Sequence, residues 1–130
     1  MTRTLTLALF GAAGLLLASA SLPTPTLAQA PGDAARGATV VKQRCVACHA
    51  VVAGKNGIGP SLVGVVGRKA ASSAGFKYSP KLAASGLTWD RATLDRYLAA
   101  PMKTVPGTSM MINVPGAADR ADIIAYLASL

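Results

Sequence analysis

The chain has 130 residues, of which thirteen are basic and five acidic, a formal net charge of +8, and it holds only two cysteines and one histidine. A structural zinc site takes about four thiolate or imidazole ligands, and a blue-copper site takes more than one imidazole, so this inventory excludes both. The basic balance comes without a basic helix or an aromatic stacking face, which makes nucleic acid a poor partner.

Residues 1–30 have the pattern of a secretory signal peptide. Arg3 gives a short basic start, and residues 5–20 form an apolar run with almost no charge. This run is somewhat short for a membrane span, and Pro23 and Pro25 would break a helix that continued beyond it. The sequence therefore predicts export rather than membrane insertion.

The predicted cleavage point lies near residues 28–30. Cleavage after Ala30 fits the rule of small residues at the site but leaves proline at the new N-terminus, so cleavage after Ala28 is the alternative. A leader that is kept as a membrane anchor is a second alternative. Export to the periplasm would leave one small domain at 31–130, with twelve basic against five acidic residues and a balance of +7.

The first part of this domain is predicted to be a helix followed by a long loop. Asp33 is the predicted N-cap of a helix that runs to about Arg44, and Gly37 leaves a flat spot where another helix can cross closely. Seven glycines and two prolines at 50–86 predict loop, with at most one short helix at 79–84. So long a loop suits a compact domain only if it wraps around a bound group.

Two further helices are predicted in the last third of the chain. The first covers about 90–99, with Thr88 as its cap and Pro101 as its stop. The second runs from Asp119 to the C-terminus, and Asp119 and Asp122 suit the positive end of its dipole. Its apolar stripe consists of Ile123, Ile124, Leu127 and Leu130. Since no strand is indicated, the fold class is all-α.

The run Cys45-Val46-Ala47-Cys48-His49 carries most of the chemistry and indicates covalent attachment of a c-type haem. In a helical segment both thiols lie on one face and can form thioether bonds to one porphyrin. The imidazole of His49 then follows at once as an iron ligand. A redox dithiol would need a strand–helix–strand unit around it, and a disulfide would close too small a loop to stabilise the fold much.

The other face of the iron needs a ligand or stays open. With no second histidine, a methionine thioether is the natural choice, and Met102, Met110 and Met111 are the candidates outside the leader. Met102 follows Pro101 at a helix end, where packing is the simpler explanation. Met110 ends the turn-forming segment 105–109, but the residue pattern alone does not separate it from Met111.

Together these features resemble the small soluble class I c-type cytochromes, typified by mitochondrial cytochrome c and its bacterial periplasmic relatives. The similarity covers essentially the whole domain, and the joint order and spacing of its motifs are specific. The motifs are Gly32-Asp33, Cys45-Val46-Ala47-Cys48-His49, Gly59-Pro60-Ser61-Leu62, Gly67-Arg68-Lys69, Gly75-Phe76-Lys77-Tyr78-Ser79, Gly86-Leu87-Thr88-Trp89, Tyr97-Leu98-Ala99-Ala100-Pro101, Pro106-Gly107-Thr108-Ser109-Met110 and Asp122-Ile123-Ile124-Ala125-Tyr126-Leu127.

The resemblance implies the cytochrome c fold, in which the N- and C-terminal helices cross and loops wrap around one haem c. It implies that Cys45 and Cys48 bind the haem covalently. It also implies that His49 and Met110 are the axial iron ligands and that Met111 serves packing.

Other matched positions imply contacts around the haem. The carbonyl of Pro60 would accept a hydrogen bond from the His49 ring. Tyr78 and Trp89 would bind a buried propionate, and Arg68 would balance its charge. Leu82 departs from the pattern, because many relatives have a polar residue of the haem-pocket water network there.

The resemblance further implies a monomeric carrier of single electrons, not an enzyme. Its partners would be a membrane quinol-oxidising complex and a terminal oxidase or photosynthetic reaction centre, reached through acidic docking surfaces and without stable membrane insertion. The usual ring of lysines is only partly present, with Arg44 and Lys103 as the clearest members. The alternatives are a peroxidase-like or gas-binding haem protein with a labile methionine, and a dedicated haem subunit of a periplasmic dehydrogenase.

Overall fold

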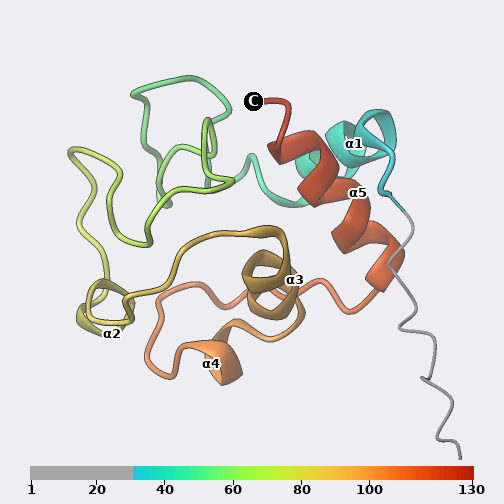
Figure 1. The fold of residues 1–130 in the computed structure, drawn as a ribbon. Coiled ribbons are helices and arrows are strands. Elements are labelled where there is room, and N and C mark those ends of the chain that lie inside the picture. Colours follow the sequence, from blue (N-terminus) through green and yellow to red (C-terminus); the bar gives the residue numbers. More distant parts are fainter. Residues whose placement is uncertain (1–30) are drawn as a thin grey trace, which may run out of the picture.

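The computed structural model describes residues 31–130, and the predicted signal peptide lies outside the described residues. Long irregular segments join the helices and surround the centre of the molecule (Figure 1). The helices are α1 (Ala34–Arg44), α2 (Pro80–Ala83), α3 (Arg91–Ala99), α4 (Pro101–Thr104) and α5 (Ala117–Leu127). Strand-like pairing within 31–130 is limited to one isolated bridge between Lys69 and Thr88, so the all-α prediction is confirmed.

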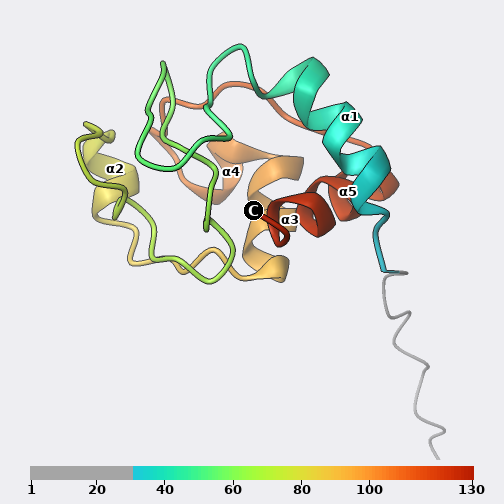
Figure 2. The ribbon, with the colours of Figure 1, turned by 90° about the horizontal axis from the view of Figure 1, so that it is seen from above.

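Helices α1 and α5 come from opposite ends of this range and pack against each other (Figure 1 and Figure 2). Gly37 is buried at the crossing, and a Cβ atom there would overlap the carbonyl group of Asp122. Gly32 approaches the carbonyl of Ala121 in the same way. The predicted crossing is thus confirmed, and it depends on glycine because the two backbones meet directly.

A polar cluster joins the start of α1 to α5. Asp33 caps α1 as predicted, since its carboxylate accepts hydrogen bonds from the amides of Ala35 and Arg36. The backbone amide of Asp33 in turn donates to Asp122 at 2.6 Å, and Arg36 Nε donates to the same carboxylate at 2.8 Å. These bonds lower the pKa of Asp122. The sequence analysis had placed Asp122 at the positive end of the α5 dipole. Instead, Asp122 lies within α5 and binds the start of α1.

Helix α3 has a different N-cap from the predicted one. Asp90, not Thr88, is the N-cap: its carboxylate accepts a 2.7 Å hydrogen bond from the Thr93 amide, and this bond lowers the pKa of Asp90. Pro101 ends α3 as predicted, but it also opens α4, a helix that the sequence analysis missed. Proline suits that first position because its missing N–H would have no partner there.

The ends of α2 and α5 are close to the expected ones. Ser79 caps α2 with a side-chain oxygen that accepts from the Leu82 amide. Helix α5 begins before the predicted Asp119, at Ala117, and Leu130 lies beyond its end but still packs against the core. Among residues 31–130, no helix has the length and apolar character needed to cross a membrane.

Side-chain hydrogen bonds hold the long irregular segment 45–79 in shape. Asn56 is one such cross-link: its Nδ2 donates to the carbonyl of Ala74 at 3.0 Å, and its Oδ1 accepts from the Ser61 amide at 3.0 Å. The same segment is tied to the chain before α3, because the amide of Trp89 donates to the carbonyl of Arg68 at 2.9 Å. The loop is therefore wrapped around the centre, as its length required.

Candidate functional site

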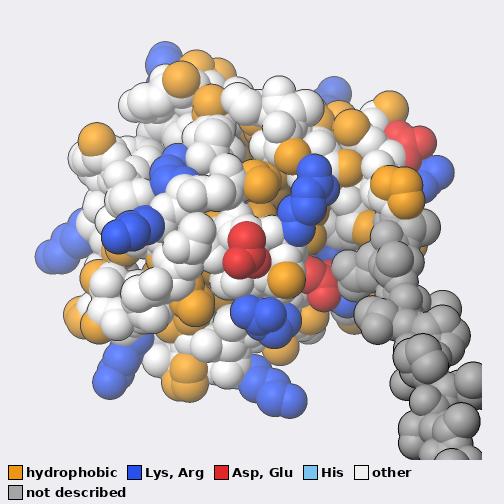
Figure 3. Space-filling model, viewed as in Figure 1, with side chains coloured by type: hydrophobic (Ala, Val, Ile, Leu, Met, Phe, Trp, Pro, Cys, Tyr) orange, Lys and Arg blue, Asp and Glu red, His pale blue; other side chains and the backbone are white. Residues whose placement is uncertain are grey.

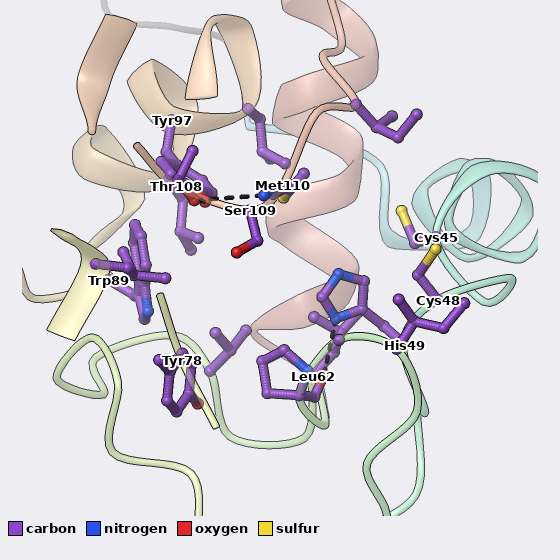
Figure 4. Close-up of a pocket in the computed structure, with 18 of the residues that line it drawn as sticks. Cys45, Cys48, His49, Leu62, Tyr78, Trp89, Tyr97, Thr108, Ser109 and Met110 are labelled. Atoms are coloured by element: carbon purple, nitrogen blue, oxygen red, sulfur yellow. Dashed lines mark hydrogen bonds between the residues drawn. The ribbon is translucent and has the colours of Figure 1, made fainter. Parts of the chain in front are cut away.

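A cavity of about 430 Å³ lies between the irregular segments, α3 and α5 (Figure 4). Its walls are mostly apolar, and a cavity of this size with a few convergent polar groups is typical of a cofactor site. The sequence-predicted site residues all line it, namely Arg68, Tyr78 and Trp89 together with Cys45, Cys48, His49 and Met110. The fold therefore brings the whole predicted set together from distant parts of the chain.

Cys45 and Cys48 reach the cavity from the end of α1. Both are free thiols and both are half-buried. The chain continues in a tight turn here, in which the amides of Cys48 and His49 donate to the carbonyl of Cys45 at 3.0 and 2.9 Å. Burial raises the pKa of the Cys45 thiol. The turn keeps both sulfurs beside one cavity, as attachment to a single porphyrin requires.

The ring of His49 is fixed by the segment at 59–60. Its Nδ1 lies 2.8 Å from the carbonyl oxygen of Pro60. Because a carbonyl only accepts, Nδ1 carries the proton, and Nε2 of the neutral ring keeps its lone pair. Gly59 is buried under the ring, where a Cβ atom would overlap it. The imidazole is thus oriented as a metal ligand needs to be.

The segment between α4 and α5 supplies another wall of the cavity and carries two of the candidate methionines. Met110 is half-buried and packs against the core, whereas Met111 is 72% exposed at the cavity mouth. Behind Met110, the hydroxyl groups of Tyr97 and Thr108 lie 2.6 Å apart in a buried hydrogen bond. Burial raises the pKa of Tyr97. Met110 is the better placed of the two thioethers, while Met102 is 45% exposed and does not line the cavity.

Arg68 tests whether the cavity suits a haem. Its terminal nitrogens donate to the carbonyls of Val63 and Ser61 at 3.0 Å each, but its Nε is buried without a hydrogen-bond partner among the described residues. A buried guanidinium donor is costly unless it meets an acceptor. An acidic group of a ligand in the cavity would supply one, so the residues fit an apolar ring that bears carboxylates.

Tyr78, Trp89 and Leu82 also line the cavity. The phenol oxygen of Tyr78 accepts from the amide of Ser73 at 3.2 Å, which leaves its O–H able to donate. Trp89 is buried. Leu82 is half-buried and lines the cavity without a polar group. The cavity wall is therefore apolar where many relatives have a polar residue.

The sequence analysis missed two charged residues near this site. Arg120 of α5 forms an ion pair with Asp95 of α3 through a 2.7 Å contact from Nε to Oδ1, and their side chains are only 11% and 19% exposed. The sequence offered only a weak signal for this pair, because Arg120 lies in a predicted helix with one apolar face and reads as an ordinary charge on its other face. A buried charge needs a partner of opposite charge, and here Arg120 and Asp95 are partners of each other.

Comparison with known proteins identifies the family. The family model for cytochrome c matches residues 34–130. The chain is 58% identical over 87 residues to cytochrome c2 iso-2 of Magnetospirillum fulvum, covering 66% of this chain and 91% of that protein. It is 46% identical over 117 residues to cytochrome c2 of Rhodomicrobium vannielii, covering 88% of this chain and 93% of that protein.

A solved structure agrees with this assignment. Cytochrome cH from Methylobacterium extorquens superposes with a TM-score of 0.72 and 46% sequence identity, over 76% of this chain and all of that one. The helical fold thus agrees with similarity both in sequence and in structure. The chain belongs to the cytochrome c family, and it is an electron carrier with one covalently attached haem c rather than an enzyme.

Proposed function

We propose that this protein carries single electrons on a haem bonded to Cys45 and Cys48, with His49 and Met110 as the axial iron ligands. The observation that carries the proposal is that these four side chains line one apolar cavity (Figure 4). When bound, the haem supplies an iron that gains and loses one electron, at a potential that a thioether ligand raises. With His49 and Met110 both bound to it, the iron would have no open position for a substrate.

His49 and its neighbours keep the ring in one tautomer and orientation. The Pro60 carbonyl oxygen, 2.8 Å from Nδ1, accepts the hydrogen bond that keeps the proton on Nδ1. This hydrogen bond strengthens Nε2 as a ligand. Gly59 leaves the space that the ring occupies. A ligand that is held this firmly moves little when the charge of its metal changes, and this favours fast electron transfer.

Three residues are proposed to bind the acidic edge of the porphyrin. The unpartnered Nε of Arg68 supports a charge-assisted hydrogen bond to a carboxylate. Tyr78 and Trp89 have an O–H and an N–H donor, respectively, on the same cavity. Leu82 adds an apolar surface beside them, so fewer ordered waters are expected than where a polar residue occupies this position.

We also propose that the partners are membrane complexes with acidic docking surfaces in the periplasm, a quinol-oxidising complex as donor and a terminal oxidase or reaction centre as acceptor. Basic side chains are spread over the face in Figure 3, where acidic ones are few. Arg44 and Lys77 lie at the cavity, and Ile58 and Met111 are 81% and 72% exposed at its mouth. Such a surface supports docking that is steered by charge and weakened by salt.

The ligand assignment is tested with Met110→Ala and, as its matched control, Met111→Ala. Loss of the Met110 thioether is expected to lower the reduction potential, remove the sulfur-to-iron charge-transfer band and let the oxidised protein bind cyanide. Because Met111 is exposed, its replacement should change none of these. The reverse pattern would assign the ligand to Met111, and no change in either variant would reject methionine ligation.

A further inference from the structure

Residues 105–114, called here the Met110 loop, are fastened to α3 along their length. The fastening begins just before the loop, at α4, and continues to its last residue. The hydrogen bonds run from Thr104 Oγ1 to the Arg96 carbonyl at 3.0 Å, between Thr108 Oγ1 and Tyr97 Oη at 2.6 Å, and from the Val114 amide to the Leu98 carbonyl at 2.7 Å.

Arg120 adds a second fastening where the loop ends. Its Nη1 donates to the carbonyls of Val114 at 3.0 Å and Pro115 at 2.7 Å, and its Nε donates to Asp95 at 2.7 Å. One guanidinium thus joins α5, α3 and the end of the Met110 loop. Val114 itself is only 2% exposed, so this end of the loop is buried as well as hydrogen-bonded.

We propose that Asp95 and Arg120 are positioning residues for Met110: their ion pair holds the end of the Met110 loop closed and keeps the thioether in the cavity. The inference rests on the proposed role of Met110 as an iron ligand. It assigns the firmness of that ligand to two residues that do not line the cavity.

The ion pair can act in this way because the arginine charge is buried. With Asp95 in place, its carboxylate balances the guanidinium charge and orients the planar group so that Nη1 donates to both carbonyls. Without the carboxylate, the guanidinium gains by turning toward water, which breaks the bonds to Val114 and Pro115. The loop end then opens more often, and Met110 leaves the iron more often with it.

A second ion pair on α5 provides the matched control. Asp122 pairs with Arg36 of α1 and is as buried as Arg120, but among the described residues its carboxylate forms no hydrogen bond or ion pair with the Met110 loop. Asp122→Asn should therefore weaken the fold without freeing Met110. Asp95→Asn removes one carboxylate charge in the same way, and only this variant should weaken the ligand.

The experiment uses the oxidised holoprotein and measures cyanide affinity, the charge-transfer band and amide hydrogen exchange. Asp95→Asn is expected to raise cyanide affinity by about tenfold and to speed exchange of the Val114 amide more than that of the Trp89 amide, which a coupling of ordinary size would give. Asp122→Asn should leave cyanide affinity unchanged. Met110→Ala serves as the reference for full loss of the ligand.

Two outcomes would overturn the proposal. If Asp95→Asn and Asp122→Asn, compared at equal loss of unfolding free energy, bind cyanide equally, the positioning role is rejected. If Met110→Ala itself does not bind cyanide more tightly, the proposed ligation fails and not merely this inference. Should Asp95→Asn not fold, Arg120→Lys replaces it, since it keeps the positive charge but lacks the planar group that spans both carbonyls.

Discussion

The Nδ1 atom of His49 lies 2.8 Å from the carbonyl oxygen of Pro60. This contact joins the end of the Cys-x-x-Cys-His run to the long loop, and it sets which ring nitrogen is left to bind a metal. A backbone carbonyl cannot be removed by substitution, but the glycine that lets the two groups meet can be changed.

Gly59→Ala is expected to displace the His49 ring. The added Cβ atom would overlap the ring, which must shift at a cost of about 1–3 kcal/mol of unfolding free energy. Both the midpoint of urea unfolding and the reduction potential should fall. The comparison variant is Gly64→Ala, where φ is +64° but the Cβ atom meets nothing. It carries only backbone strain, so an equal change of potential in the two variants would contradict the account.

Gly37→Ala should push α1 and α5 apart. Its Cβ atom would collide with the Asp122 carbonyl, which is backbone and cannot yield cheaply, so we expect a loss of about 1–3 kcal/mol or more in urea unfolding. Gln43→Ala on an exposed position of the same helix is the control and should change stability little. An unchanged midpoint for Gly37→Ala would mean that the helices do not meet at this residue.

Asp122 is expected to make stability depend on pH in the acid range. Its pKa is lowered by the bonds from Arg36 and the Asp33 amide, so the folded state favours the ionised form. The stabilisation is fully present above the pKa of the unfolded chain, about 3.9, and is lost as pH falls through the lower folded pKa. Asp122→Asn should lower stability at pH 7 and flatten the acid limb of a stability curve. A variant that follows the parent curve at every pH would contradict this.

Ala71→Gly should stabilise the protein. Ala71 has φ of +59°, a left-handed conformation that costs alanine about 1–2 kcal/mol and glycine almost nothing. The greater freedom of glycine in the unfolded chain offsets about 0.5–1 kcal/mol of this, which leaves a net gain of up to about 1.5 kcal/mol in the free energy of urea unfolding. Ala74→Gly, in the same loop, has no strain to relieve and should be neutral or destabilising. A loss in both variants would argue against the strain.

The sequence predicted the parts of the fold that local chemistry decides. Asp33 caps its helix where the pattern indicated, the short helix predicted at 79–84 is present as α2, and Gly37 lies at the predicted crossing. The cap of α3 was wrong because Thr88 and Asp90 are both good caps, and the choice depends on which one reaches the Thr93 amide. Proline at 101 was recognised as a stop, but the same residue also opens α4.

The candidate site was predicted more completely than the contacts that support it. Motif spacing predicted the roles of Cys45, Cys48 and His49, and family resemblance favoured Met110 over Met111. The residue pattern alone could not predict that Met111 is 72% exposed. The pairing of Asp95 with Arg120 joins two helices that are distant in sequence. Each residue alone looks like an ordinary surface charge, so only the packed structure makes them partners.

The central claim is that one haem is bonded covalently to Cys45 and Cys48. The most direct test is the intact mass of the denatured, exported protein after treatment with a thiol alkylating reagent and acidified organic solvent. The account predicts the polypeptide plus one haem, no alkylated cysteine and pigment that stays with the protein. A bare polypeptide that takes up the reagent on both cysteines, or pigment that passes into the solvent, would contradict it.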